Sequence, residues 1–505
     1  MKRYFSLLLA LLLISGTVSC GKGNDGKETK ETVQSTAVTD TETAADGEKS
    51  GARLDSGLGS ADFDGYKFNI YVHIGTAVPT NDFDAEELNG EPINDAKYAR
   101  VITVQELANC VIEDIVITTD NAQGHTKLGN SVQAGTNDYD LASLTANSSC
   151  NALVAGFLAN LNKVGNLDLS REWWDQRAVE SFTFKDAVYQ ATGDISIYDN
   201  RATFCCYFNK NMAADYELPN MYEMVDNGTW TLDNLKALAE AVPVLDTNSD
   251  GNHINDPNDL YGIYVWDDVM IGMVNACGIQ CCTLDQDGKL SLTLFSERFV
   301  DAFSKFSASL FNKDVTCAYQ RNTYTGVDFG QIAFMESRAL FFLKSLLAAT
   351  ELRDMEDDFG ILPLPKYDEA QDGYCNSAAS WTLTLYSIPK NAYGDEGLAR
   401  AGYITQALAY ESLYTLTPAY YDQTLQNKVS RDVESSRMLD LIFSTRFYDL
   451  GWYFGIGGFN EKVMNLLRNY STDVTSMYQK AEKSASSKLT NYNEKLQEMI
   501  AADNG

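Results

Sequence analysis

The segment Tyr66-Lys67-Phe68-Asn69-Ile70-Tyr71-Val72 (YKFNIYV) opens the folded part of the chain and predicts a β-strand. Its apolar residues alternate with polar ones, which is the two-residue period of a half-buried strand. A second strand is predicted at 111–117, a helix at 95–107 between the two, and a short apolar stretch after Asp138-Tyr139-Asp140-Leu141. Strands that alternate with helices predict an α/β fold with a largely parallel sheet.

Upstream of this strand, the sequence divides into a leader and a spacer. A short positive start precedes the apolar run Leu7–Ile14, which is too short to span a bilayer. Thr17-Val18-Ser19-Cys20 follows and resembles a bacterial lipobox, although the usual first residue of that motif is Leu. We therefore expect a signal peptide at 1–19 and lipidation of Cys20; the alternative is an ordinary signal peptide. Residues 20–61 are small, polar and charged, which predicts a flexible tether.

Length and charge restrict the function. A chain of 505 residues is too long for one core, so two or more lobes are expected. The formal net charge of −31 opposes binding to nucleic acid. Three histidines and the absence of GxSxG, HExxH and P-loop motifs argue against histidine-based, zinc or nucleotide chemistry.

Two downstream segments predict buried helical faces. Thr231 is placed to cap a helix whose apolar residues recur at helical spacing and which stops at Pro243. Phe299, Phe303 and Phe306 also recur on one face, a pattern more typical of core packing than of a cofactor site.

Across about residues 62–460, the order of several segments resembles the extracellular solute-binding proteins of ABC importers, family 1. The resemblance rests on the segments 138–141, 173–176 with 188–195, 207–212, 227–232, 329–343 and 358–365. In the fifth segment, Ser337-Arg338 stands where the family commonly has Gly-Lys.

The resemblance implies a two-lobed, hinge-connected, periplasmic-binding-protein-like α/β fold of type II. Lobe 1 is expected at 62–195 plus 376–412, and lobe 2 at 196–375 plus 413–505. It further implies a non-enzymatic, monomeric lipoprotein, held outside the bacterial cell membrane by its lipid anchor. Such a protein would capture a carbohydrate (an oligosaccharide) between its lobes and deliver it to ABC permease subunits. Two alternatives stay open: a secreted glycoside hydrolase, which would need paired carboxylates, and a surface adhesin lipoprotein.

Carbohydrate sites combine flat aromatic faces with a few oriented polar groups. Trp452 and Tyr453 precede a glycine-rich turn and resemble an aromatic pair of the family, so they are the first platform candidates. Trp266 and Trp381 are expected near the cleft edges, and Trp173 either faces the ligand or packs in lobe 1.

Polar ligand contacts are expected at two places. Asp140 is expected at the end of a strand, where α/β sheets present groups to ligands. Tyr198, Asp199 and Arg201 lie at the first expected crossing between lobes. Asp199 and Arg201 could clasp ligand hydroxyls or form an internal salt bridge.

The segment Asp246-Thr247-Asn248-Ser249-Asp250-Gly251 matches the first half of an EF-hand-like loop. Oxygen ligands at positions 1, 3 and 5 and a glycine at position 6 suit Ca²⁺. Position 12 is Pro257 rather than Glu, so the expected remaining ligands are Asn252 with Asp256 or Asp259. The prediction is a structural Ca²⁺; the alternative is a polar surface turn.

Overall fold

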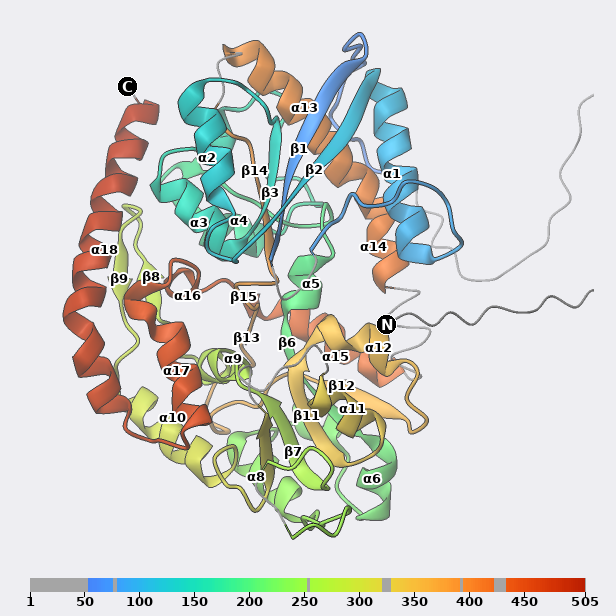
Figure 1. The fold of residues 1–505 in the computed structure, drawn as a ribbon, viewed down its shortest axis with the longest axis vertical. Coiled ribbons are helices and arrows are strands. Elements are labelled where there is room, and N and C mark those ends of the chain that lie inside the picture. The colour runs from blue at the N-terminus through green and yellow to red at the C-terminus, as the bar shows by residue number, and fades with distance from the viewer. Residues whose placement is uncertain are drawn as a thin grey trace, which may run out of the picture. The chain divides into compact units, whose positions relative to one another are not determined.

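Two β-sheets with helices packed against them organise Asp55–Gly505 in the computed structural model of the chain (Figure 1). The structure describes residues 53–75, 80–251, 255–319, 328–390, 394–421 and 433–504. The chain divides into the units Met1–Leu54 and Asp55–Gly505, and the second carries both sheets. The expected leader and Cys20 lie outside the described residues. Within the described residues, no helix combines the length and apolarity that crossing a membrane requires.

The first sheet has the strand order β14-β3-β1-β2, and only β14 is antiparallel to its neighbour. Its strands are β1 (Tyr66–Gly75), β2 (Cys110–Thr119), β3 (Leu141–Thr145) and β14 (Thr384–Ser387). Successive strand residues point to opposite faces, so Phe68 and Ile70 join one buried cluster and Tyr71 another. The strands and helix expected from the sequence in this region are confirmed.

Helices cover both faces of this sheet (Figure 1). The helices α1 (Pro92–Ala108) and α13 (Gly394–Tyr414) pack on the face that carries Phe68. The helices α2 (His125–Ala134) and α3 (Ala146–Val154) pack on the face that carries Tyr71. The first sheet and these four helices are called the first lobe below.

The second sheet has the order β10-β7-β11-β6-β12, in which β6 is antiparallel to both of its neighbours. Its strands are β6 (Phe204–Asn209), β7 (Tyr261–Trp266), β10 (Thr316–Tyr319), β11 (Ala339–Ser345) and β12 (Phe359–Leu362). All six residues of β6 are buried, and the five from Phe204 to Phe208 alternate between two core clusters. This inner strand therefore has no solvent-facing side.

The helices around the second sheet bury the faces that the sequence predicts. They are α6 (Lys210–Asp215), α7 (Met221–Asp226), α8 (Leu232–Glu240), α9 (Val269–Ala276), α10 (Glu297–Ala308), α11 (Phe329–Met335), α12 (Ala349–Leu352) and α15 (Val433–Ser444). The hydroxyl of Thr231 caps α8 by accepting a hydrogen bond from the Asn234 amide at 3.4 Å. Phe299, Phe303 and Phe306 of α10 are fully buried, which confirms their core role. The second sheet with these helices is called the second lobe.

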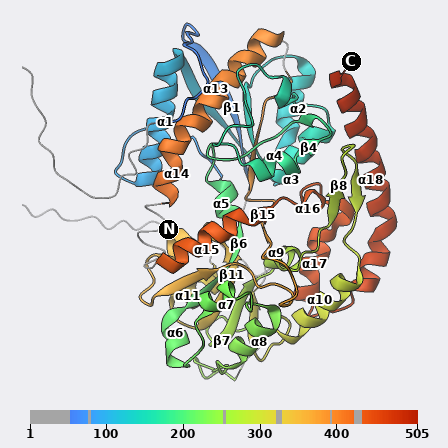
Figure 2. The same ribbon diagram turned by 180° about the vertical axis from the view of Figure 1, so that it is seen from behind.

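The remaining elements join the lobes or pack beside them. They are η1 (Leu161–Lys163), α4 (Gln176–Ser181), β4 (Thr183–Phe184), β5 (Ala187–Val188), α5 (Tyr198–Ala202), β8 (Cys282–Leu284), β9 (Leu290–Leu292), η3 (Leu346–Ala348), β13 (Asn376–Ser377), α14 (Leu416–Pro418), β15 (Arg446–Phe447), α16 (Leu450–Tyr453), η5 (Ile456–Gly458), α17 (Phe459–Arg468) and α18 (Val474–Asn504). α5 leads from the first lobe into the second, and β13 leads back towards β14. Figure 2 shows α18 running beside the β8 and β9 hairpin.

Arg446 of β15 is buried where the connecting segments meet. Its guanidinium donates to the carboxylate of Asp175 at 2.6 Å and to that of Asp199 at 3.0 Å. It also donates to Asn200 at 2.9 Å and Thr203 at 3.2 Å, both next to or within α5. Because Asp175 belongs to the segment before α4 and β15 pairs with β13, one side chain holds three parts of the interlobe connection together.

The two carboxylates respond differently to this shared cation. Burial raises the pKa of Asp199 to about 6, against the opposing pull of Arg446. Burial acts in the same direction on Asp175, but there Arg446 and the Tyr448 hydroxyl outweigh it and lower the pKa of the carboxyl. Arg446 therefore compensates one buried carboxylate fully and the other in part.

We predict that Arg446→Met destabilises the protein by about 3–5 kcal/mol, because it leaves two buried carboxylates without their cation. Urea unfolding at pH 7.5, followed by tryptophan fluorescence, measures the free energy of unfolding. Arg177→Met removes an exposed arginine of α4 and should leave that free energy unchanged. Equal values for the two variants would contradict the role given to Arg446.

Candidate functional site

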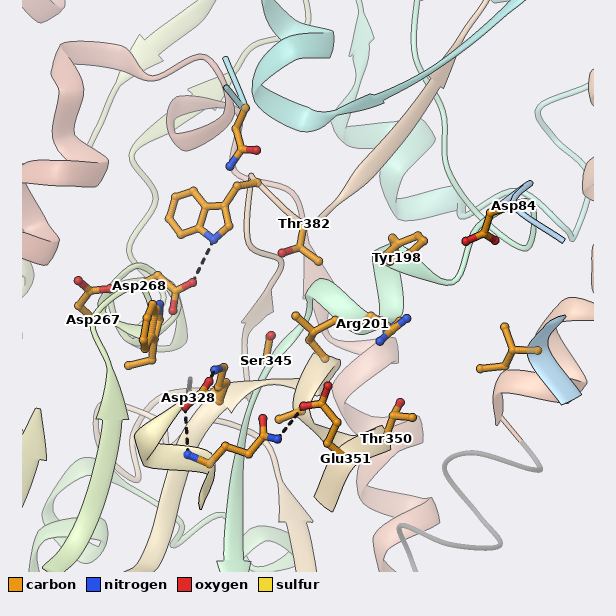
Figure 3. A pocket seen from close by; sticks show the side chains of 18 of the residues that line it. Asp84, Tyr198, Arg201, Asp267, Asp268, Asp328, Ser345, Thr350, Glu351 and Thr382 are labelled. Atoms are coloured by element: carbon orange, nitrogen blue, oxygen red, sulfur yellow. Dashed lines mark hydrogen bonds and ion pairs between the residues drawn. The ribbon is translucent and has the colours of Figure 1, made fainter. Parts of the chain in front are cut away.

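A cavity of about 600 Å³ lies between the two lobes (Figure 3). Residues that directly follow parallel strands line it: Asn121 after β2, Asp267 and Asp268 after β7, and Leu347 and Ala348 after β11. The carboxyl ends of parallel strands are the usual ligand edge of an α/β sheet. The volume falls within the roughly 300–1,000 Å³ of small-molecule sites.

Two partly buried tryptophans stand at one end of the cavity. Trp266 is the last residue of β7, and its ring packs edge-on against Tyr319 with centroids 4.9 Å apart. Trp381 comes from the segment between β13 and β14, and its indole nitrogen donates to the carboxylate of Asp268 at 3.1 Å (Figure 3). This hydrogen bond fixes the orientation of both the indole and the carboxylate.

A partly buried ion pair lies beside Trp266. The ammonium of Lys344, on β11, donates to the carboxylate of Asp328, which also caps α11 by accepting from the Gln331 amide at 3.0 Å. The same ammonium lies 4.9 Å from the centroid of the Trp266 ring. Burial lowers the pKa of Lys344 to about 8, although the carboxylates of Asp268 and Glu351 oppose the shift.

A second ion pair fixes the neighbouring acid. Arg468 of α17 donates to the carboxylate of Asp267 at 2.6 Å and to that of Glu461 at 2.9 Å. The side chains of Arg468 and Asp267 are 7% and 1% exposed, so this contact is shielded from solvent. Asp267 is thus neutralised from outside the cavity, whereas Asp268 faces Trp381.

The other end of the cavity is formed by α5 and the start of α1. Figure 3 shows Tyr198 and Arg201 apart from Asp267 and Asp268. The guanidinium carbon of Arg201 lies 5.3 Å from the centroid of the Tyr198 ring. Nearby in the lining, the ammonium of Lys97 donates to the carboxylate of Asp84 at 2.8 Å.

Four of the residues singled out from the sequence line this cavity: Tyr198, Arg201, Trp266 and Trp381. Asp199 does not line it. Its carboxylate pairs with Arg446, so the internal salt bridge left open by the sequence exists, but with a different arginine.

The remaining sequence-based candidates are buried away from the cavity. Asp140 precedes β3 rather than ending a strand, and it accepts hydrogen bonds from the Tyr66 hydroxyl at 2.7 Å and the Asn69 amide at 2.9 Å. Trp173 is 1% exposed and packs against Tyr410, with ring centroids 5.1 Å apart.

The first platform candidates are also core residues in this structure. The Trp452 indole donates to the Asn275 side-chain oxygen at 3.1 Å, and the ring is 1% exposed. The Tyr453 hydroxyl donates to the Ala378 carbonyl at 3.2 Å, and its ring stacks on Phe182. These contacts bind α16 to α9 and to the interlobe segment, so the pair supports the walls without lining the cavity.

Several lining residues were missed by the sequence reasoning, among them Asp267, Asp268, Asp328, Lys344 and Lys97. A signal for the first two was present: Asp267-Asp268 directly follows the apolar, aromatic run at 261–266. No local pattern pointed to Asp328 and Lys344, because their pairing depends on the contact between α11 and β11.

The expected calcium loop lies at the edge of the second lobe. The carboxylate of Asp246 accepts from the amides of Asp250 at 3.2 Å and Gly251 at 2.9 Å, and the Asn248 amide group donates to Asp256 at 3.3 Å. Asp259 is buried and accepts from the Thr247 amide at 3.1 Å. Asn252 lies outside the described residues. In the described part of the chain, no three His, Cys, Asp or Glu side chains gather as a metal site.

Comparison with known proteins shows which fold the chain has. No protein-family model matches the sequence, and no curated protein matches it significantly. An ABC substrate-binding protein from Listeria monocytogenes in complex with cycloalternan is 12% identical, with a TM-score of 0.54 over 85% of this chain and 99% of that one. The cyclic alpha-maltosyl-1,6-maltose binding protein from Arthrobacter globiformis is 12% identical, with a TM-score of 0.53 over 87% and 100%.

A third similar structure has a different ligand. UgpB from Mycobacterium tuberculosis in complex with glycerophosphocholine is 15% identical, with a TM-score of 0.51 over 87% of this chain and 99% of that one. Together these matches show a two-lobed, periplasmic-binding-protein-like α/β fold, as the sequence predicts.

We predict that Ca²⁺ raises the melting temperature of the full-length protein after treatment with EDTA. The carboxylate and amide oxygens of the loop 246–259 would bind the ion, and the bound ion would stabilise the folded state. Asp250→Ala should abolish the shift. Asp287→Ala, which removes an exposed carboxylate of the β8–β9 turn, should retain it. A melting temperature that does not respond to Ca²⁺ would rule out the site.

Proposed function

We propose that this protein is an extracytoplasmic substrate-binding receptor that captures a carbohydrate, in the size range of an oligosaccharide, for an ABC importer. The observation that carries the proposal is the interlobe cavity, where Trp266 and Trp381 stand beside the oriented carboxylate of Asp268. Sugar rings present apolar faces and hydroxyl edges, and this combination complements both. The fold supports the proposal, since two of the similar structures have names that include a sugar ligand.

Lobe closure is the mechanism that this architecture favours. The cavity takes side chains from both lobes and from α5 between them, so a ligand in it contacts all three. A ligand that contacts both lobes binds the closed arrangement more tightly and shifts the population towards it. The work of the protein is then binding and release, with no bond broken.

The membrane arrangement is part of the same proposal. A lipid on Cys20 would tether the receptor to the outer side of the cell membrane, where permease subunits of the importer would receive the ligand. Two acyl chains anchor a protein stably, whereas one alone is marginal. Radiolabelled fatty acid should therefore enter the protein in cells, and Cys20→Ala should prevent it.

The rival function that shares the same cavity is glycoside hydrolysis. Asp267, one of its buried carboxylates, is paired with Arg468 and is poorly placed to act as an acid or a base. Incubation with oligosaccharides, followed by chromatography, distinguishes the two: released products mean an enzyme, and saturable binding of an unchanged ligand means a receptor.

We predict that Trp381→Ala lowers the affinity for the captured sugar at least about tenfold, because it removes an aromatic face and the hydrogen bond that orients Asp268. A thermal-shift screen of neutral and acidic oligosaccharides, with glycerophosphocholine included, identifies the ligand. Isothermal titration calorimetry then measures the dissociation constant.

Phe295→Ala is the matched control for this substitution. Phe295 is an exposed aromatic residue that stacks on Tyr478 of α18, outside the cavity lining. Its removal should leave the dissociation constant unchanged. An unchanged constant for Trp381→Ala would instead exclude the proposed platform.

A further inference from the structure

Six carboxylates and three cations line the cavity, and one of the cations has no ion-pair partner in the described chain. Three cations belong to the lining: Lys97, Arg201 and Lys344. The ammonium of Lys97 pairs with Asp84, and that of Lys344 pairs with Asp328. The side chain of Arg201 makes no hydrogen bond or ion pair with any residue of the described chain, and its Nε is buried.

The surroundings of Arg201 leave its charge uncompensated. Asp199, two residues before it, is taken up by Arg446. Glu351 lines the cavity as well, but it is exposed, accepts from the Gln331 side chain at 2.6 Å and forms no ion pair with Arg201. Removing a guanidinium from water without giving it a hydrogen-bond acceptor raises the free energy of the unliganded protein. A ligand that supplies the acceptor to Arg201 therefore binds more tightly.

We propose, on the basis of the proposed function, that the captured oligosaccharide is acidic and carries a uronic-acid carboxylate that Arg201 binds. The planar guanidinium presents N–H groups in a fork that matches a carboxylate through two parallel hydrogen bonds. The ring of Tyr198, against the guanidinium, holds the fork in place. Trp266, Trp381 and Asp268 then hold a neutral sugar unit at the other end of the cavity.

The polarity of the cavity fixes the orientation of such a ligand. Asp268 accepts hydrogen bonds, so its end suits the hydroxyl groups of a neutral ring and repels a carboxylate. At the other end the guanidinium of Arg201 supplies unpaired donors for the acidic unit, while the nearby carboxylate of Glu351 is bound by the Gln331 side chain. Asp268 and Arg201 lie apart in the lining (Figure 3), so different parts of the ligand reach them.

The test uses the full-length protein and pairs of oligosaccharides that differ only at one C6 position, hydroxymethyl in one and carboxylate in the other. Isothermal titration calorimetry should give at least about tenfold tighter binding of the uronate member. Arg201→Gln should remove this preference, because the affinity for the uronate member falls to that for the neutral member. Arg201→Lys keeps the charge but loses the fork, so it should restore only part of the preference.

Arg177→Gln, the same change of charge on an exposed site of α4, separates a local effect from one of net charge and should keep the full preference.

Equal or tighter binding of the neutral member by the unaltered protein overturns the inference and leaves the proposed sugar receptor standing. Equal losses for both members in Arg201→Gln overturn it too, because Arg201 would then bind a hydroxyl. Tighter binding of a C6 sulfate ester than of the uronate overturns the carboxylate assignment. Binding of no oligosaccharide at all, with another library compound bound, overturns the proposed function itself.

Discussion

The ion pairs of Arg446 with Asp175 and Asp199 are the interaction on which the relation between the two lobes depends. Each lobe has its own sheet, while one buried cluster contains residues of both lobes. The guanidinium joins a segment of the first lobe, the helix α5 and the strand β15 at one buried point. Breaking such a point leaves buried carboxylates behind, and this cost confines motion to rotations that preserve it.

The cavity follows from this junction. In α5, Asp199 contacts Arg446, and Arg201, two residues later, lines the cavity. In the same way, β13 pairs with β15, and the segment that follows β13 presents Trp381. The buried pair Trp452 and Tyr453 fills the space behind this segment through Asn275 and Ala378. Residues at the interlobe junction and residues that line the cavity are therefore neighbours in sequence, which would connect ligand binding to the proposed lobe closure.

Much of the fold could be predicted from the sequence, because local periodicity decides it. The alternation at 66–72, the cap at Thr231 and the phenylalanines of α10 each mark an element that the structure contains.

Within the site, four residues that the sequence singled out at strand ends and crossings line the cavity: Tyr198, Arg201, Trp266 and Trp381. Asp140 does not line the cavity, because β3 begins after it and it lies at the opposite end of that strand from the cavity. Trp452 does not line it either, and an aromatic pair before a glycine turn has the same sequence pattern whether it faces a ligand or the core. Lys344 and Asp328 could not be predicted, since their pairing exists only once β11 and α11 pack. The residue bounds of the two lobes stay a prediction.

The net charge of −31 and the uncompensated Arg201 point in opposite directions, and their positions resolve the conflict. Charges on the surface are screened over about 8–10 Å at moderate ionic strength, so they affect the approach of an acidic ligand more than its bound state. Inside the cavity, salt screens charges only weakly, so the affinity for an acidic ligand depends on the charged group that the ligand contacts. An acidic surface with an unpaired, partly buried Arg201 in the cavity would thus bind an acidic sugar tightly but capture it slowly, and faster as salt screens the surface. A neutral sugar would show neither effect. The salt dependence of the association rate therefore reports on the ligand class independently of any contact that Arg201 makes.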